Sequence, residues 1–358
     1  MKPVYHVIGT MSGTSLDGLD VAFCRFEYAD KKWSYNIIKA TTYKYSKIWK
    51  TKLSKAANTD ALEFSILHND FGMFCGNLIL KFIKENKFNP DFICSHGHTV
   101  FHQPKKKLTV QIGSGASIAA VTGITTVCDF RTTDVALGGQ GAPLVPIGDK
   151  LLFAQYDICL NIGGFSNLSF TKNLKRIAFD VCPANIALNY LANKAEKEFD
   201  NDGNMASNGK ICKPLLHKLD GLNYYKDNPP KSLGKEWLDN VFIPVLESFP
   251  DLTINDLLRT CTEHIARQIA TQITQIDAKK VLVTGGGAFN TFLMNLVRSK
   301  CKSEIIIPEK DLVNYKEALI FALLGVLRIR GENNCLCDVT GAKHDNCGGT
   351  VYLSNSSK

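Results

Sequence analysis

Two segments of this chain have the same order of elements, in which a short apolar strand, a glycine-rich turn and a second strand follow one another. In the first segment these are Tyr5–Ile8, Gly9–Asp20 and Val21–Phe26, and in the second they are Asp157–Asn161, Gly163–Ser166 and Asn167–Phe170. Each segment is followed by a further strand that ends in an aspartate, Asp129 in the first half and Asp180 in the second. A layout repeated in this way predicts two related α/β halves.

Short β-branched runs alternate with longer amphipathic stretches along the rest of the chain, as is typical of α/β proteins. Further strands are predicted at Asp91–Cys94, Thr125–Cys128, Arg176–Phe179, Lys280–Thr284 and Glu304–Ile307. Helices are predicted at Ala61–Glu85, Ser114–Thr122, Pro183–Glu196, Ile254–Ile276, Asn290–Lys300 and Tyr315–Arg330. Pro183 suits the first turn of its helix, where a missing N–H costs no hydrogen bond.

A length of 358 residues favours two domains. The composition, 45% hydrophobic and 21% charged, is that of a globular chain and excludes disorder as the main state. The net charge of +8 is dispersed, whereas proteins that bind nucleic acids concentrate basic residues on one face. We therefore expect an attraction for small anions and no nucleic-acid partner.

No apolar run is long enough to cross a membrane, and the N-terminal residues lack the pattern of a signal peptide. Several of the 12 cysteines, such as Cys24, Cys94 and Cys128, lie in apolar strand-like runs, where a thiol behaves as a small apolar group. We therefore expect reduced thiols, a cytoplasmic location and no membrane partner.

The segment Gly9–Asp20 has the residue types of a phosphate-binding turn. Glycines permit positive φ and let backbone N–H groups converge on an anion, and hydroxyls such as Ser12 add donors. Asp17 and Asp20 are candidates to hold Mg²⁺. The segment is not a Walker A loop, because no Lys-Ser/Thr follows at the required spacing, and not a Rossmann fingerprint, because a strand follows it.

A second glycine-rich turn, Gly285-Gly286-Gly287, comes between a predicted strand and a predicted helix. At such a turn a phosphate or a flat ring can approach the backbone closely. Taken alone this is weak evidence for a site, because tight strand-to-helix turns also favour glycine.

In this order, the motifs resemble those of the anhydro-N-acetylmuramic acid kinases, whose fold is the actin/Hsp70/hexokinase-like (ribonuclease H-like) ATPase fold. The resemblance covers nearly the whole chain and rests on Gly9–Asp20, Gly123–Pro146, Asn161–Leu168, Lys231–Gly234 and Gly285–Asn290. It implies two α/β domains around a central nucleotide cleft. The first domain comprises residues 1–146 and 311–358 and the second residues 147–310.

The resemblance also implies the reaction. ATP drives the opening of the 1,6-anhydro ring of anhydro-N-acetylmuramic acid: water adds at the anomeric carbon, and O6 is phosphorylated. The product is N-acetylmuramic acid 6-phosphate, an intermediate of peptidoglycan recycling. The implied cofactors are ATP and Mg²⁺, the implied partner is an amino sugar, and a homodimer is left open.

The residue roles that the resemblance implies fall into four groups. Asp129 matches the catalytic base, and Glu317 matches an acidic residue near the sugar. The nucleotide and its phosphates are assigned to Gly13, Thr14, Ser15, Leu16, Asp17, Gly18, Leu19, Asp20, Gly163, Gly164, Gly285, Gly286 and Gly287. The sugar is assigned to Arg131, Gln140 and His96. Mg²⁺ is assigned to Asp17 and Asp180, directly or through water.

The chain departs from the family pattern at three places. The Gly-Asp that usually precedes Glu-Ala in the family is absent before Glu317. Asp180-Val181-Cys182-Pro183-Ala184-Asn185 stands where the family usually has Asp-Thr-Gly-Pro-Gly-Asn, so two glycines and a hydroxyl are lost. His98 stands where the family usually has glutamine. These changes concern nucleotide binding and the choice of sugar.

Other functions stay open from the residues alone. The same fold serves nucleotide-switched proteins that touch no sugar, and kinases of other amino sugars. His96, His98 and His102 are expected to be structural or cleft-lining, because no carboxylate or cysteine near them completes a metal site. Cys335, Cys337, His344 and Cys347 are ligands of the type zinc prefers, but their spacing favours a loop with free thiols.

Overall fold

The computed structural model describes residues 2–354 and divides the chain into two compact units. The first unit runs to Leu152 and resumes at Tyr315, and the second unit is Phe153–Asn314. These boundaries lie a few residues beyond the ones that the family resemblance implies. Each unit is built around one β-sheet, so the predicted mixed α/β class is confirmed.

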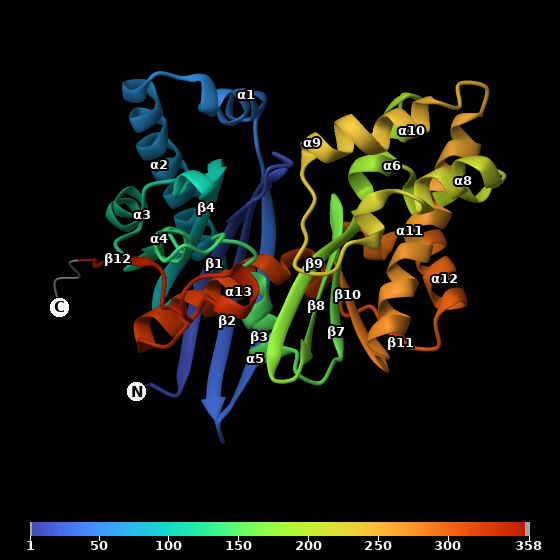
Figure 1. Cartoon of the computed structure of the whole chain (residues 1–358). Coiled ribbons are helices and arrows are strands. Elements are labelled where there is room, and N and C mark those ends of the chain that lie inside the picture. Colours follow the sequence, from blue (N-terminus) through green and yellow to red (C-terminus); the bar gives the residue numbers. More distant parts are fainter. Residues whose placement is uncertain (1, 355–358) are drawn as a thin grey trace. The chain divides into compact units, whose positions relative to one another are not determined.

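The sheet of the first unit has seven strands (Figure 1). They are β1 (Val4–Ser12), β2 (Gly18–Ala29), β3 (Lys32–Lys44), β4 (Phe92–Gln103), β5 (Leu108–Ile112), β6 (Thr126–Cys128) and β12 (Thr350–Tyr352). Their order is β12-β6-β4-β1-β2-β3, and β5 pairs with β4. The parallel pairs β1·β4 and β4·β6 form the centre, and β2 and β3 extend the sheet as antiparallel neighbours.

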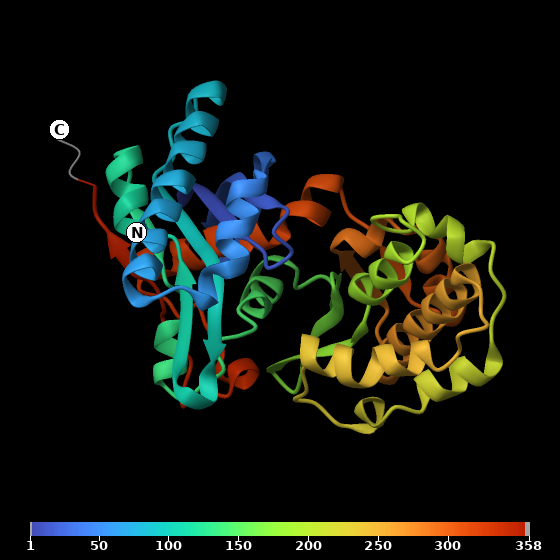
Figure 2. The same cartoon turned by 90° about the horizontal axis from the view of Figure 1, so that it is seen from above.

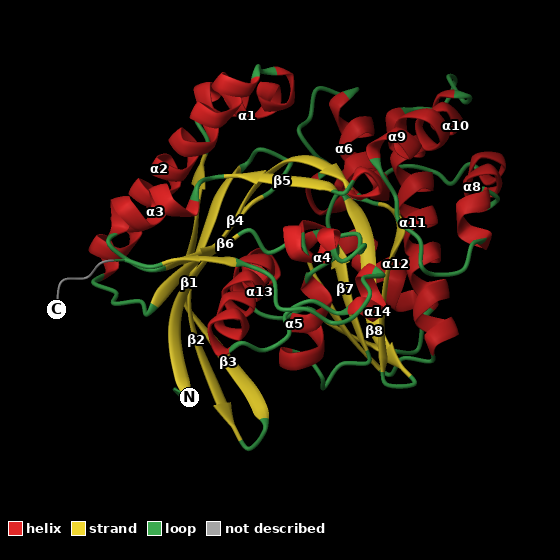
Figure 3. Ribbon diagram, turned by 60° about the vertical axis from the view of Figure 1, so that its left-hand side comes forward, coloured by secondary structure: helices red, strands yellow, loops and turns green. Residues whose placement is uncertain are grey.

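The helices of the first unit are α1 (Lys47–Lys55), α2 (Ala61–Asn86), α3 (Gly115–Thr122), α4 (Thr132–Ala136), α5 (Val145–Leu152) and α14 (Cys337–Thr340). The long helix α13 (Lys310–Arg330) starts in the second unit and continues into the first. Figure 2 shows α2, in light blue, alongside the strands, and Figure 3 shows α2 and α3 on one face of the sheet and α13 on the other.

Strand β1 explains how both faces of this sheet are covered. Successive side chains of a strand point to opposite faces. Ile8 packs in the cluster that includes Phe71 and Ile79 of α2, whereas the next residue, Gly9, faces α13. A Cβ on Gly9 would lie 2.0 Å from the carbonyl oxygen of Ala318, so glycine is required for α13 to pack this closely. From Tyr315 onward, α13 belongs to the first unit and packs on its sheet.

The sheet of the second unit has five strands in the order β11-β10-β7-β8-β9. They are β7 (Ile158–Ile162), β8 (Phe165–Lys172), β9 (Lys175–Pro183), β10 (Lys280–Thr284) and β11 (Glu304–Ile306). Its helices are α6 (Asn185–Asn193), α7 (Asn204–Ser207), α8 (Lys213–Asp220), α9 (Lys235–Trp237), α10 (Ile243–Glu247), α11 (Ile254–Ile276) and α12 (Thr291–Lys300). Strands and helices share one hydrophobic core.

Helix α11 is the central helix of this core, and its ends follow from the sequence. Thr253 caps the N-terminus by accepting a hydrogen bond from the backbone N–H of Asp256, and Asp277 ends the helix in the left-handed conformation. Between them, apolar residues recur at helical spacing, and those such as Leu258, Ile265 and Ile269 are fully buried.

Three expectations from the sequence need correction. Pro183 ends strand β9 and does not start a helix, because β9 is an edge strand that tolerates a missing N–H, and α6 begins at Asn185. Asp180 lies inside β9, at an irregularity in its pairing with β8, and not at the strand's end. His96, His98 and His102 lie within β4, which continues to Gln103, and not after a strand.

The segment Gly9–Asp20 is also more regular than predicted. Strand β1 continues to Ser12 and β2 starts at Gly18, so only residues 13–17 form the turn. Strand β3 was missed, because its many polar and exposed residues hide its alternation. No helix among residues 2–354 is both long and apolar enough to cross a membrane.

Candidate functional site

The turn between β1 and β2, residues 13–17, is the first candidate phosphate site and is called the phosphate turn below. Thr14, Ser15 and Asp17 are exposed on it. The backbone N–H of Leu16 donates to the carbonyl of Gly13, 3.3 Å away, and Leu16 adopts a positive φ of 59°. The positive φ that we expected at a glycine therefore falls on Leu16.

Gly13 and Gly18 are glycines for different reasons. A Cβ on Gly13 would meet only the Ser15 hydroxyl, at 3.5 Å, so the protein itself leaves room there. A Cβ on Gly18 would lie 2.5 Å from the carbonyl oxygen of Tyr43 on β3, so β2 and β3 need glycine to pair. Leu19, the next residue, is 1% exposed and packs in the core, so it has a structural role.

We therefore expect Gly13→Ala and Gly18→Ala to separate binding from stability. Gly13→Ala should leave the melting temperature nearly unchanged and weaken ATP·Mg²⁺ binding about 10-fold or more, if a phosphate approaches the backbone there. Gly18→Ala should lower the free energy of unfolding by about 1–3 kcal/mol through strain. Calorimetric titration and thermal unfolding measure the two effects. Unchanged nucleotide affinity in Gly13→Ala would make the turn a structural hairpin only.

Asp20, on β2, carries the most perturbed carboxylate of this turn region. The Thr42 hydroxyl donates to Asp20 Oδ1 over 2.6 Å, and Thr42 also lies 3.4 Å from the Tyr315 hydroxyl. Burial raises the pKa of Asp20 to about 6, the Thr42 hydrogen bond opposes this, and the nearby Glu317 and Asp17 carboxylates add to it. Perturbed carboxylates of this kind gather at functional sites.

The raised pKa of Asp20 predicts a stability difference that depends on pH. Well below pH 4 the carboxyl is neutral in both the folded and the unfolded chain. As pH rises from about 4 to about 6, the unfolded chain ionises this group while the folded protein does not, so the folded state loses stability, and the loss is complete above pH 6. Asp20→Asn keeps the acceptor for Thr42 and avoids this cost. Above pH 7 it should be more stable than the wild type by about 1–3 kcal/mol.

Denaturant unfolding between pH 4.5 and 8, without nucleotide or Mg²⁺, measures this difference. Asp30→Asn is the matched control, because Asp30 is exposed in the turn between β2 and β3 and is not among the groups that shift the pKa of Asp20. A difference between Asp20→Asn and the wild type that is constant over this pH range would contradict the raised pKa.

Asp129 follows β6 and is hydrogen-bonded to the start of helix α4. Its φ is 57°, a left-handed conformation that is uncommon for a residue other than glycine. Asp129 Oδ1 accepts a hydrogen bond from the Thr132 hydroxyl over 2.5 Å, at the first residue of α4. Burial raises the pKa of Asp129, and the hydroxyl and backbone N–H of Thr132 oppose this.

Two of the three residues that the resemblance assigns to the sugar, Arg131 and His96, are hydrogen-bonded to each other. Arg131 donates from Nε to His96 Nε2 over 3.0 Å and from a terminal nitrogen to the carbonyl of Gly141 over 2.7 Å. His96 Nδ1 lies 2.9 Å from the carbonyl of Gly97, and burial holds the pKa of His96 well below its usual range. Both ring nitrogens of His96 thus form hydrogen bonds, and the neutral ring orients the Arg131 guanidinium. The Gln140 side chain is exposed.

Glu317 lies just after the break in helix α13. Tyr315 has non-helical backbone angles (φ −118°, ψ 16°), and the following Lys316 forms an ion pair of 2.7 Å with Asp149 of α5. Both partners of this pair are buried. The Glu317 side chain reaches solvent, yet the protein atoms around it raise its pKa, and the Arg131 guanidinium opposes this shift most. Arg131, Glu317 and Asp20 therefore belong to one electrostatic cluster.

A buried set of hydrogen bonds that we did not predict links β1 to β4. The Tyr45 hydroxyl donates to Ser12 Oγ over 2.7 Å, and Ser12 Oγ lies 3.1 Å from His98 Nδ1. Burial lowers the pKa of His98 to about 4, so the ring is neutral at pH 7. His98, which replaces the family's usual glutamine, is thus a satisfied structural histidine next to the phosphate turn.

In the second unit, the two predicted glycine turns lie against each other. Gly285 has a φ of 83°, and a Cβ there would lie 2.7 Å from Asn161 Oδ1, while one on Gly287 would lie 2.2 Å from Ile162. Both glycines are needed for packing against the end of β7. Gly286 and Gly164 have only distant neighbours, at 3.7 Å, so the backbone is accessible to a ligand at these two residues.

Asp180 is held where β9 meets the loop that follows α8. Asp180 Oδ2 accepts a hydrogen bond from the backbone N–H of Leu233 over 2.8 Å, and its carbonyl accepts one from the Tyr224 hydroxyl over 2.6 Å. Among the described residues Oδ1 has no hydrogen-bond partner. Burial raises the pKa of Asp180 to about 6, and the Leu233 hydrogen bond opposes this. The side chain is therefore fixed through one oxygen, with the other available.

The residues after Asp180 that depart from the family pattern pack in the hydrophobic core. Val181, Cys182 and Ala184 are at most 2% exposed and belong to the core of the second unit. The backbone N–H groups of Ala184 and Asn185 donate to the carbonyls of Gly164 and Gly163, so the backbone of this segment remains bonded to the β7–β8 turn.

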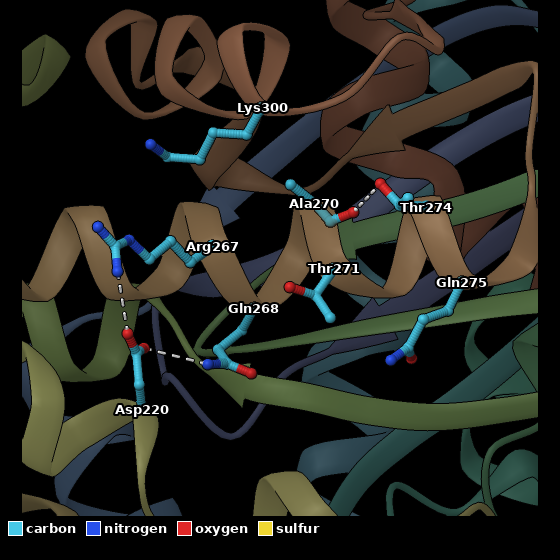
Figure 4. A pocket seen from close by; sticks show the side chains of 8 residues that line it. All are labelled: Asp220, Arg267, Gln268, Ala270, Thr271, Thr274, Gln275 and Lys300. Carbon is cyan, nitrogen blue, oxygen red and sulfur yellow. Dashed lines mark hydrogen bonds and ion pairs between the residues drawn. The ribbon is translucent and has the colours of Figure 1, made fainter.

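Two other features do not form the site. A pocket of about 540 Å³ is lined by residues of α11 together with Asp220 and Lys300 (Figure 4). It contains none of the predicted site residues, and its cations Arg267 and Lys300 are both paired with Glu263.

Within residues 2–354, no three His, Cys, Asp or Glu side chains are placed to hold a metal. The Cys335 thiol, one of the candidate zinc ligands, donates to the Asp134 carboxylate instead.

Comparison with known proteins agrees with the motifs. The family model described as anhydro-N-acetylmuramic acid kinase matches residues 5–354. A protein of that name from Bacillus thuringiensis (strain Al Hakam) is 31% identical, with 98% of each chain covered. Another from Caldanaerobacter subterraneus subsp. tengcongensis is 32% identical, with 97% of this chain and 96% of the relative covered.

Among solved structures, component A of the (R)-2-hydroxyglutaryl-CoA dehydratase from Acidaminococcus fermentans is similar, with a TM-score of 0.45 and 13% identity over 89% of this chain and 96% of that one. The sequence matches are far stronger, and they define an enzyme of the sugar kinase class. The chain belongs to the anhydro-N-acetylmuramic acid kinase family. The resemblance seen in its motifs is therefore confirmed.

Proposed function

We propose that the enzyme uses ATP to open and phosphorylate 1,6-anhydro-N-acetylmuramic acid, giving N-acetylmuramic acid 6-phosphate and ADP, as a step in peptidoglycan recycling. The main support is the family match over residues 5–354. The candidate site carries the groups that this chemistry needs: a basic residue beside a carboxylate, a carboxylate with a raised pKa, and two turns with accessible backbone.

In the proposed reaction, water attacks the anomeric carbon and the bond from that carbon to O6 breaks. The released O6 attacks the γ-phosphorus of ATP, and ADP leaves. A carboxylate takes one proton from the attacking water and later releases it to solvent. As the bond between the anomeric carbon and O6 breaks, positive charge develops on that carbon. Water is drawn to such a carbon, so a carboxylate is a strong enough base to take the proton of the attacking water.

Asp129 and Asp180 are both candidates for this base. The family resemblance points to Asp129, but the hydroxyl and backbone N–H of Thr132 both bond to its carboxylate and anchor it at the start of α4. Asp180 accepts a hydrogen bond through Oδ2 only, and its Oδ1 has no hydrogen-bond partner among the described residues. Burial raises the pKa of both carboxylates, to about 6 for Asp180, and a base works best when its pKa lies near the operating pH. We therefore take Asp180 as the base and keep Asp129 as the alternative.

The remaining residues bind and orient. We assign the sugar to Arg131 and Gln140, with His96 holding Arg131, and assign the phosphates to the phosphate turn and to the backbone at Gly164 and Gly286. When bound, Mg²⁺ supplies charge neutralisation on the phosphates. Asp17 and Asp20 are suited to hold it, directly or through water, because Asp17 and Glu317 already raise the pKa of Asp20 and a cation would relieve that repulsion.

Incubation with ATP·Mg²⁺ and a panel of sugars tests the proposal. The panel contains 1,6-anhydro-N-acetylmuramic acid, N-acetylmuramic acid and N-acetylglucosamine, and mass spectrometry identifies the products. We expect turnover of the anhydro sugar with a mass gain of one phosphate and one water. Turnover of the open sugars alone would indicate another amino-sugar kinase, and ATP hydrolysis without a sugar product would indicate a nucleotide-switched protein.

A further inference from the structure

The proposed sugar residues Arg131 and Gln140 flank a buried carboxylate that the proposed mechanism does not use. Asp134, on α4, is 0% exposed. An ionised carboxylate in such a position is costly unless several donors satisfy it, so its partners indicate what it holds in place.

Four donors from two distant parts of the chain converge on Asp134. Oδ1 accepts from the Cys335 thiol over 3.0 Å, the Thr340 hydroxyl over 2.8 Å and Asn346 Nδ2 over 2.9 Å. Oδ2 accepts from the backbone N–H of Gly141 over 2.8 Å. We call Cys335, Thr340 and Asn346 the C-terminal clasp.

The other end of this network is the segment that carries the proposed sugar residues. Gly141 donates to Asp134 through its N–H, and its carbonyl accepts from Arg131. The N–H of Gln140 donates to the carbonyl of Thr340 over 2.8 Å, so the clasp also holds the backbone of Gln140 directly. A Cβ on Gly139 would lie 2.2 Å from Asp134 Oδ2, so the segment lies directly against the carboxylate.

We propose that Asp134 is a positioning residue for sugar binding, which fixes segment 138–141 and, through Gly141, the guanidinium of Arg131. Through the C-terminal clasp, residues 335–346 thereby help to hold the segment that carries the proposed sugar residues, without themselves being assigned to the sugar. This assignment rests on the proposed function, since it takes Arg131 and Gln140 as the residues that bind the sugar.

Asp134→Asn is the main test. The amide is nearly isosteric, but it places an NH₂ group where one carboxylate oxygen now accepts hydrogen bonds, so either Gly141 or the clasp loses its acceptor. We expect amide hydrogen exchange in peptides covering 137–144 to speed up about 10- to 100-fold, and KM for the anhydro sugar to rise in the same range while kcat changes only a few-fold. ATP affinity should not change.

Two controls separate positioning from loss of stability. Ile79→Ala truncates a fully buried residue of α2 in the same unit and should lower the melting temperature without altering exchange in 137–144 or KM. Cys335→Ser keeps a donor to Asp134 and should behave as the wild type, whereas Thr340→Val removes one donor and should act in the direction of Asp134→Asn to a smaller extent. Thr340→Val also serves if Asp134→Asn does not fold.

The outcomes are distinct. If Asp134→Asn changes exchange and KM no more than Ile79→Ala does, Asp134 has only a structural role and the inference is wrong. Faster exchange with unchanged KM would also overturn it, because the segment would then not bind the sugar. If the wild-type enzyme does not turn over the anhydro sugar, the proposed function fails, and exchange in 137–144 still decides whether Asp134 holds this segment.

Discussion

Asp180→Asn is expected to retain the fold and the binding of ATP and sugar and to lose about 10²–10⁴ of kcat, because the amide keeps the size of the side chain and an acceptor but cannot take a proton from water. The loss should appear in kcat more than in KM. Steady-state kinetics with 1,6-anhydro-N-acetylmuramic acid, together with calorimetric binding of each substrate, measure both quantities.

Asp129→Asn is the matched variant, with the same chemical change at the competing carboxylate. If Asp129 only anchors the start of α4, the asparagine still accepts from the Thr132 hydroxyl and kcat should fall less than about 10-fold. If the assignment implied by the resemblance is right instead, Asp129→Asn should carry the large loss and Asp180→Asn the small one. Equal and small losses in both variants would exclude a carboxylate base at either residue.

The dependence of kcat/KM on pH tests the proposed base independently. A base must be deprotonated to act, so kcat/KM of the wild type should fall as pH drops through the raised pKa of the base, near 6 for Asp180. In ¹⁸O-labelled water the label should appear at the anomeric carbon of the product. Label in the phosphate instead would mean that water attacks phosphorus, which contradicts the mechanism.

Lys316→Met should produce the largest loss of stability. It removes the cation that lies 2.7 Å from the Asp149 carboxylate, in a pair whose two residues are both buried. Removing one partner of a buried ion pair typically costs about 3–5 kcal/mol, because the remaining charge stays desolvated and loses that attraction. Equilibrium denaturation measures the loss, and kcat should fall as well because Lys316 precedes Glu317 on α13.

The double variant Lys316→Met/Asp149→Leu is its control. It removes both charges, so it should recover most of the stability that Lys316→Met loses. Lys235→Met, which breaks an exposed pair with Asp239, should cost less than about 1 kcal/mol. A loss in Lys316→Met as small as that in Lys235→Met would show that the pair does not stabilise α13.

The order of strands and glycine turns was predictable from the sequence, because alternation of apolar residues and clusters of glycine are local signals. β10 and α11 have the predicted bounds, Lys280–Thr284 and Ile254–Ile276. The motifs were also sufficient to place the chain in its family. What local signals missed is β3, an edge strand whose polar face is solvated and therefore looks like a loop.

The sequence by itself predicted which residues carry the chemistry: Asp129 and Asp180, the glycine turns, and the Arg131–Gly141 segment. Only the tertiary structure decided what each of them does, since roles depend on contacts between distant residues. Gly18 must be glycine because a carbonyl oxygen of β3 lies against it, and His96 accepts a hydrogen bond from Arg131. Asp134 accepts hydrogen bonds from residues some two hundred positions away in the chain. Burial and long-range hydrogen bonds set pKa values and orientations, and no pattern of neighbouring residues contains them.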